Sequence, residues 1–209
     1  MTRREVVILV AVTAVLAMVV LPTLSQYWAQ SRRIRCVSNF KNIGLALRIF
    51  SNDHGGSFQW QLSGTNGTKD LLYDPYDAWR HFAFISNELS NPANLRCPTD
   101  SERATARDFG SFGPHNLSYF LGLLADEAEP KTLLGGDRNL TTNGFEVGPG
   151  LLRLGSAQNA AFSDKLHRNA GNILLGDGSV WQASSLQFQE AVKDAAEASR
   201  NTINRLLIP

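Results

Sequence analysis

The N-terminal region of the chain is strongly apolar. Residues 6–21 carry no charge, and Thr13 is the one polar residue among them. Pro22 interrupts this run, and Thr23 and Leu24 extend the uncharged stretch. As a helix rising about 1.5 Å per residue, positions 6–24 reach roughly 28 Å, which is about the thickness of a bilayer's hydrocarbon core. The pattern predicts a transmembrane helix.

An amphipathic stripe follows the apolar run. Cys36, Phe40, Ile43, Leu47 and Phe50 recur at spacings of 4, 3, 4 and 3, which places them on one face of a helix. The long helix is therefore predicted to extend from residue 5 to about residue 53, where the sequence His-Gly-Gly ends it. Its first half suits lipid, and its second half suits the core of a domain.

The rest of the chain predicts an α+β fold. After an extended piece and loop over residues 57–69, the pattern favours a helix over 77–89 and strands over 116–124, 131–134 and 151–154. The glycine pair 135–136 is predicted to close the second strand, and residues 171–183 a hairpin with a two-residue type I′ turn at Asp177-Gly178. A C-terminal helix starts at Ser184 or Ser185, with Leu186 on its apolar side, and an apolar tail docks after it.

Two parts follow from this order: residues 1–30 as a membrane and assembly helix, and residues 31–209 as a globular domain. The domain includes the amphipathic half of the long helix, packed on a small antiparallel sheet.

Charge and composition exclude few functions. The chain has 20 basic and 19 acidic side chains, for a net charge of +1, and this balance argues against a nucleic-acid partner. The one dense cationic cluster is Arg32, Arg33 and Arg35, which follows the apolar run at a distance that suits lipid headgroups. These arginines are interpreted as interfacial anchors.

The sequence carries no familiar catalytic motif, so we expect a protein that is not an enzyme. Nucleophile-elbow, zinc-protease, P-loop and dinucleotide patterns are all missing from the sequence. No cofactor is expected, although acidic residues in the loops, such as Asp100, Asp126 and Asp137, leave a calcium site open without EF-hand spacing.

The two cysteines allow two interpretations. Cys36 lies on the apolar stripe, and Cys97 follows the predicted short helix in an Arg-Cys-Pro step. In an oxidising compartment, a disulfide between them would fasten the domain to the long helix. The alternative is two separately buried thiols, and the spacing alone does not choose between them.

These features resemble type IV pilins and type II secretion pseudopilins. Glu5 followed by an apolar run, Pro22 and a long amphipathic helix is their N-terminal pattern, and residues 36–56 are similar to pseudopilins of the general secretion pathway protein G type. Residues 95–100, 116–120 and 136–140 resemble further signatures of a pilin-like subgroup. Its C-terminal mark is a His, nine residues and Asp-Gly, which here is His167 followed by Asp177 and Gly178.

The resemblance implies a pilin-like fold and a structural role. Such a protein is a subunit of a secretion pseudopilus or type IV pilus-like filament in bacteria, held in the inner membrane by one span with its domain in the periplasm. Its partners would be further copies, other pilin-like subunits and the assembly machinery. Glu5 is the family's buried carboxylate, which pairs with the N-terminal amine of a neighbouring subunit, and Pro22 allows the helix to bend.

One departure from the family pattern leaves alternatives open. The family's precursor has a basic leader ending in Gly before an apolar residue, whereas this chain starts Met1-Thr2-Arg3-Arg4-Glu5. Either Met1 is the first mature residue, or this member is never processed and is a membrane-anchored relative. A second hypothesis is a membrane-tethered enzyme or ligand-binding domain, marked by a deep pocket that gathers His81, His115 or His167 with carboxylates. A third is a secreted domain released by signal cleavage.

Overall fold

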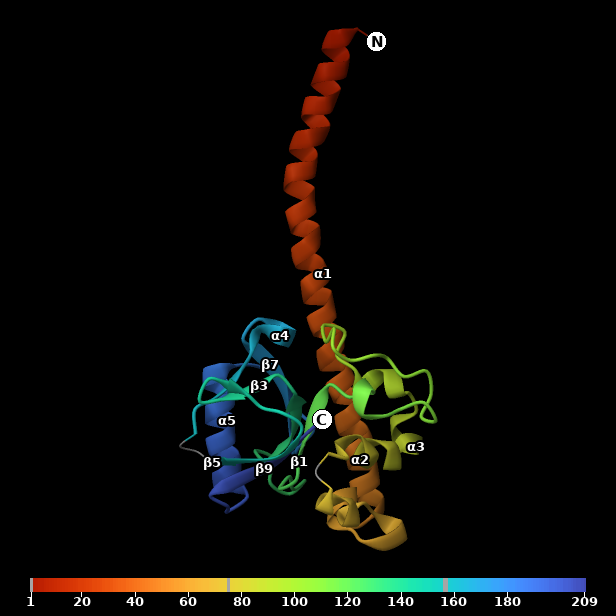
Figure 1. The fold of residues 1–209 in the computed structure, drawn as a ribbon, viewed down its shortest axis with the longest axis vertical. Coiled ribbons are helices and arrows are strands. Elements are labelled where there is room, and N and C mark those ends of the chain that lie inside the picture. The colour runs from red at the N-terminus through yellow and green to blue at the C-terminus, as the bar shows by residue number, and fades with distance from the viewer. Residues whose placement is uncertain (1, 75, 156–157) are drawn as a thin grey trace.

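The computed structural model describes residues 2–74, 76–155 and 158–209. Its longest element is helix α1 (Arg3–Asp53), which projects far beyond the rest of the chain (Figure 1). A capping box starts the helix: the Thr2 hydroxyl accepts a hydrogen bond from the Glu5 N–H, and the Glu5 carboxylate accepts one from the Thr2 N–H. After the helix, Gly55 and Gly56 adopt positive φ angles. The predicted long helix is confirmed.

The N-terminal part of α1 is exposed in the described chain. The segment Arg3–Leu21 is long and apolar enough to cross a membrane, and none of it is buried. α1 continues through Pro22, which interrupts the apolar run of the sequence but not the helix. Membrane helices tolerate proline where neighbouring groups satisfy the freed carbonyl. The side chain of Pro22 lies outside the described part of the structure.

The C-terminal part of α1 is the spine of the domain. The five residues of the predicted stripe, from Cys36 to Phe50, are each at most 4% exposed. Gly44 lets α1 approach strand β7 (Ala170–Leu175) closely, since a Cβ there would lie 2.8 Å from a methyl group of Leu174. The amphipathic half of the helix is therefore buried on one face, as predicted.

Short helices cover one side of α1. They are η1 (Gln59–Gln61), η2 (Gly64–Asn66), η3 (Lys69–Tyr73), α2 (Ala78–Phe84), α3 (Ser86–Leu89), η4 (Pro92–Leu95) and η5 (Pro114–Asn116). The extended piece predicted over residues 57–69 is wrong, because Phe58 and Trp60 stack on each other in the core and the chain turns around them. The helix predicted over 77–89 is divided at Ile85. Asp77 precedes α2, but its carboxylate pairs with Arg80 and does not cap the helix.

The larger sheet has six antiparallel strands in the order β5-β9-β1-β2-β7-β8. These are β5 (Gly150–Gly155), β9 (Ile203–Ile208), β1 (Tyr119–Gly122), β2 (Leu133–Asp137), β7 and β8 (Val180–Ser184). The tail that was predicted to dock is β9, which pairs with both β5 and β1 inside the sheet. The glycine pair predicted to end the second strand lies within β2. Glycine is needed there because a side chain at Gly136 would overlap the Phe120 ring.

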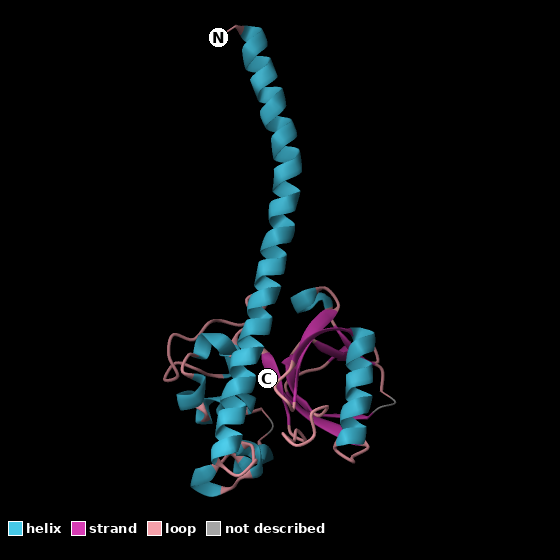
Figure 2. Cartoon of the chain, turned by 180° about the vertical axis from the view of Figure 1, so that it is seen from behind, coloured by secondary structure: helices cyan, strands magenta, loops and turns pink. Residues whose placement is uncertain are grey.

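The sheet lies between two helices, as Figures 1 and 2 both show. Leu121, Leu174 and Leu207 face the core formed with α1, whereas their strand neighbours Ile173 and Leu206 face the core formed with α5 (Ser185–Ala198). This alternation buries the sheet on both faces. The observed fold is α+β with an apolar N-terminal helix, an antiparallel sheet and a C-terminal helix.

The second core is completed by α5 and a small sheet. Ser184 caps α5 through a capping box with Gln187, as the sequence indicated. Leu186 was predicted on the apolar side of this helix but is 72% exposed, while Phe188 and Val192 are buried. The small sheet has the order β4-β3-β6, with strands β4 (Phe145–Glu146), β3 (Leu140–Thr142) and β6 (Ala160–Phe162), and α4 (Asp164–His167) follows it.

The hairpin of β7 and β8 is confirmed, but its turn differs from the prediction. A type I′ turn needs positive φ at both Asp177 and Gly178, and only Gly178 has it. The Gly178 N–H donates to the Leu175 carbonyl, and the Leu175 N–H donates to the Ser179 carbonyl. The loop therefore has three residues, with the glycine in the left-handed position.

Candidate functional site

A disulfide joins α1 to the loop after η4. Cys36 and Cys97 are bonded, with their Cα atoms 5.3 Å apart, and both are fully buried. Of the two interpretations that the sequence left open, the structure supports the disulfide and not two separate thiols. It closes a loop of 61 residues and holds the second half of α1 to the domain.

A group of buried polar side chains lies beside the disulfide. The Nε2 atom of His167, at the end of α4, is 3.4 Å from the Cys97 sulfur and 3.4 Å from a carboxylate oxygen of Asp137 at the end of β2. Asn172 in β7 connects the group: its side-chain amide lies 3.2 Å from this Nε2 atom and donates to the Asp137 carboxylate at 2.8 Å. The Asn172 N–H also donates to Asp137, at 2.6 Å.

Burial determines the charges in this group. It raises the pKa of the Asp137 carboxyl to about 7, since the charged form loses its hydration. It lowers the pKa of His167 to about 4, and the positive charge of Arg33 acts in the same direction. His167 is therefore neutral near pH 7, and its contact with Asp137 is not an ion pair.

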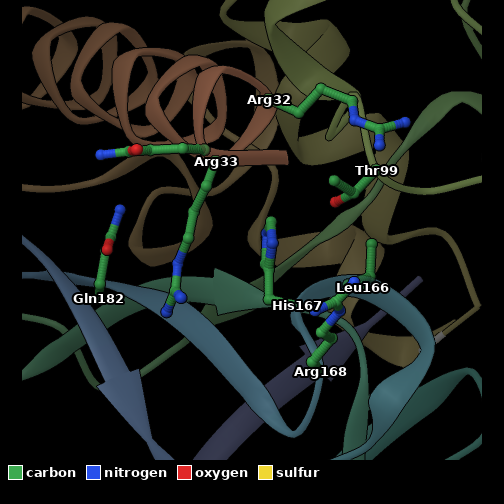
Figure 3. Close-up of a pocket in the computed structure, with 8 residues that line it drawn as sticks. Arg32, Arg33, Thr99, Leu166, His167, Arg168 and Gln182 are labelled. Carbon is green, nitrogen blue, oxygen red and sulfur yellow. The ribbon is translucent and has the colours of Figure 1, made fainter. Parts of the chain in front are cut away.

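A pocket of about 450 Å³ opens above His167, between α1 and the loop that carries α4. Figure 3 shows the His167 ring pointing toward α1 and the Arg33 side chain extending from α1 into the space between His167 and Gln182. Arg32 and Arg168 line the pocket as well. Three arginines from two separate segments thus surround one opening.

These arginines have no carboxylate partner within salt-bridge distance among the described residues. The ion pairs of the described chain involve other basic side chains, and Arg32, Arg33 and Arg168 are not part of them. The Nε atom of Arg33 is buried and has no hydrogen-bond partner among the described residues, which is costly for a donor. The pocket is therefore lined by three arginines that no salt bridge neutralises in the described chain.

The metal-binding potential of the site depends on the state of the cysteines. Ligand atoms of Cys36, Cys97 and His167 all lie within 4.8 Å of one another. Because the two sulfurs are bonded to each other, they do not offer the thiolates that zinc requires. Of the acidic residues considered for calcium, Asp100 is engaged with Arg138 at 2.8 Å. The expectation of no cofactor, with a calcium site left open, stays untested.

The structure separates the other residues that the sequence singled out. Glu5 lies in the first turn of α1, outside the pocket lining, with one oxygen used by its own capping box. His167 precedes β7, whereas Asp177 and Gly178 form the turn after it, so the two parts of the motif lie at opposite ends of one strand. The Asp177 carbonyl accepts a hydrogen bond from Arg48, which fastens the turn to α1.

The remaining histidines do not join this site. His81 is fully buried, its Nδ1 lies 2.6 Å from the Thr68 hydroxyl, and burial lowers its pKa to about 4. His115 is exposed in η5, and of these histidines His167 alone lines the pocket. The sequence reasoning missed Arg168 as a pocket residue and interpreted Arg33 only as an interfacial anchor. Their proximity arises from the tertiary fold and leaves no spacing signal.

Comparisons of the chain with protein-family models, with curated proteins and with solved structures found no match. The functional argument therefore depends on the residues and geometry described above.

Proposed function

We propose that this protein is a pilin-like structural subunit, held in the inner membrane by α1, with its α+β domain outside the cytoplasm. It assembles by packing of the apolar helices into a secretion pseudopilus or type IV pilus-like filament, and this role needs no catalysis. The observation that carries the proposal is the form of α1. One continuous 51-residue helix is both an unburied apolar rod and the spine of a folded domain.

The disulfide supports the extracytoplasmic placement of the domain. Bridges such as Cys36–Cys97 form and persist in oxidising compartments, whereas the cytoplasm of most organisms keeps thiols reduced. Tyr27 and Trp28, which are 72% and 66% exposed, follow the apolar segment where an aromatic belt meets the membrane surface.

Glu5 gives the proposal its sharpest test. In an apolar bundle, a carboxylate is stable when a cation from a neighbour pairs with it, so the charge fixes the register of adjacent subunits. Glu5→Gln keeps a residue that suits the third position of a capping box but removes the charge. Glu5→Ala removes both.

We expect full-length protein to form filaments under electron microscopy, and both variants to lose them while staying folded and membrane-inserted. A chain lacking residues 1–30 should remain monomeric. Filaments of normal length from Glu5→Gln would rule out the proposed charge pairing.

The alternative is a single-pass membrane-anchored domain that binds a ligand and does not form filaments. The arginine-lined pocket is the observation that favours it, because three arginines without salt bridges in the described chain surround one opening that suits an anionic ligand. N-terminal sequencing of the native protein tests the third hypothesis, release of the domain by cleavage, because a released domain would start beyond the apolar segment.

A further inference from the structure

We infer that the pocket formed by Arg33, Arg168 and His167 binds an anion that bears a phosphate group. The anion is either a phospholipid headgroup at the membrane surface or a soluble phosphate. This inference goes beyond filament assembly, and only its lipid form rests on the membrane placement in the proposed function.

The charge of the pocket determines the class of ligand. Arg32, Arg33 and Arg168 line it without carboxylate partners within salt-bridge distance in the described chain, and His167 is neutral at its floor. Guanidinium groups donate in a planar fork that matches phosphate oxygens. Thr99 also lines the pocket, but its hydroxyl lies 2.9 Å from the Cys97 sulfur and is already engaged there. A volume of about 450 Å³ admits a phosphate with a small organic group attached.

The Arg33 guanidinium is the second observation that points to a ligand. Its side chain extends into the pocket (Figure 3), and no salt bridge holds it among the described residues. The Nε atom is closed to solvent and has no hydrogen-bond partner among those residues, so the terminal nitrogens are the donors that a phosphate oxygen would reach. Asp137 lies beyond His167 and is already bound by Asn172. Burial raises the pKa of Asp137 and the charge of Arg33 acts against this from a distance, but the two side chains form no salt bridge.

The location of the pocket relates it to the membrane. Arg33 follows Trp28 by five residues, or about 7.5 Å along the helix axis. The exposed aromatic pair at residues 27–28 marks the expected interfacial layer, so the pocket lies just outside the headgroups. α4, which carries His167, lies at the end of the domain from which α1 emerges (Figure 1).

The test uses the full-length protein in micelles of a maltoside detergent, which carries no phosphate, and measures the melting temperature of the domain. In the first arm, inorganic phosphate is titrated into lipid-free micelles. In the second arm, phosphatidylglycerol is added to the micelles without inorganic phosphate. A ligand that binds only the folded state raises the melting temperature, and the rise grows with the logarithm of its concentration above the Kd.

We expect stabilisation in at least one arm, and the arm identifies the source of the phosphate group. Arg33→Gln and Arg168→Gln should each weaken the effect about tenfold or more in apparent affinity, because each removes a charged hydrogen bond. The matched control is Arg153→Gln, an exposed arginine on β5 that should leave the effect unchanged. Arg33→Lys should recover only part of the affinity.

Absence of stabilisation in both arms would overturn the inference, and so would an equal loss in Arg153→Gln. Arg168→Gln guards against misfolding of the Arg33 variants, since Arg168 is an exposed loop residue. The result is independent of filament formation. Loss of filaments in the Glu5 variants with intact phosphate binding would change only the proposed function.

Discussion

The two halves of α1 are both rich in apolar residues but have opposite surroundings. In the first half, Leu16 and Met18 are 57% and 75% exposed, whereas in the second half Phe40 and Leu47 are at most 1% exposed. The first half is apolar on all faces, whereas the second has one continuous apolar stripe that is buried, with Ile34, Leu45 and Ile49 exposed outside it. Periodicity, and not apolar content, therefore decides which part of a helix joins a protein core and which is left for lipid or other helices.

The largest expected effect comes from removing the disulfide that holds the second half of α1 to the domain. The double variant Cys36→Ala/Cys97→Ala should lose about 4 kcal/mol of the free energy of unfolding, because the bridge closes a 61-residue loop in the unfolded chain. Urea titration followed by circular dichroism measures the change. Dithiothreitol should destabilise the wild type by a similar amount and leave the variant unchanged. A difference below about 1 kcal/mol would mean that packing alone holds α1 in place.

Two leucine-to-alanine substitutions, one in each half of α1, test whether the two halves contribute differently to the stability of the domain. Leu47→Ala should cost about 3 kcal/mol of unfolding free energy, since it leaves a cavity in the core between α1 and the sheet. Leu16→Ala should change the stability of the domain by less than about 0.5 kcal/mol. Urea unfolding of full-length protein in detergent measures both. Equal costs would show that the first half also packs against the domain.

The buried Asp137 carboxyl, which lies near the disulfide of α1, makes the stability of the fold depend on pH. The pKa of Asp137 is raised in the folded state, so the folded protein binds a proton more tightly than the unfolded chain between about pH 4 and pH 7. The contribution of Asp137 to stability therefore falls as the pH rises through this window, by at most about 1.4 kcal/mol per pH unit, and is constant above it.

Asp137→Asn removes this fall. The stability of the variant relative to the wild type should rise between pH 4 and pH 7 and then level off, as measured by urea titrations at several pH values. His81 and His167 have lowered pKa values and contribute the opposite slope, but they are present in both proteins. A difference that does not depend on pH would show that Asp137 is ionised throughout this range.

The sequence predicted the long helix, its buried stripe and the hairpin because each has a local period that physical chemistry interprets directly. It did not predict the order of the strands. The tail at β9 carries apolar residues without turn signals, and its place beside β1 is fixed by pairing across more than 80 residues of sequence. The glycine pair in β2 was misread because glycine marks a turn as often as a close approach, here of the Phe120 ring.

The candidate site was predicted only in part. The sequence identified His167 through the resemblance and offered the disulfide as one of two interpretations. The pocket also needs Arg33 from α1 and Arg168 from a loop, separated by 135 positions. No local pattern predicts that these two arginines line one pocket, because the antiparallel sheet and the disulfide bring their segments together.

The smallest expected effect concerns the exposed face of the second half. Arg48 pairs with Glu127 at 2.8 Å, with side chains that are 46% and 26% exposed. Solvent screens such a pair, so a double-mutant cycle of Arg48→Ala and Glu127→Ala should give a coupling of about 0.5 kcal/mol that decreases in high salt. Arg35→Ala is the control, because this exposed arginine on the same helix has no ion-pair partner in the described chain. A coupling above about 2 kcal/mol would mean that the outward face of α1 also holds the domain, and the contrast between its buried and exposed faces would fail.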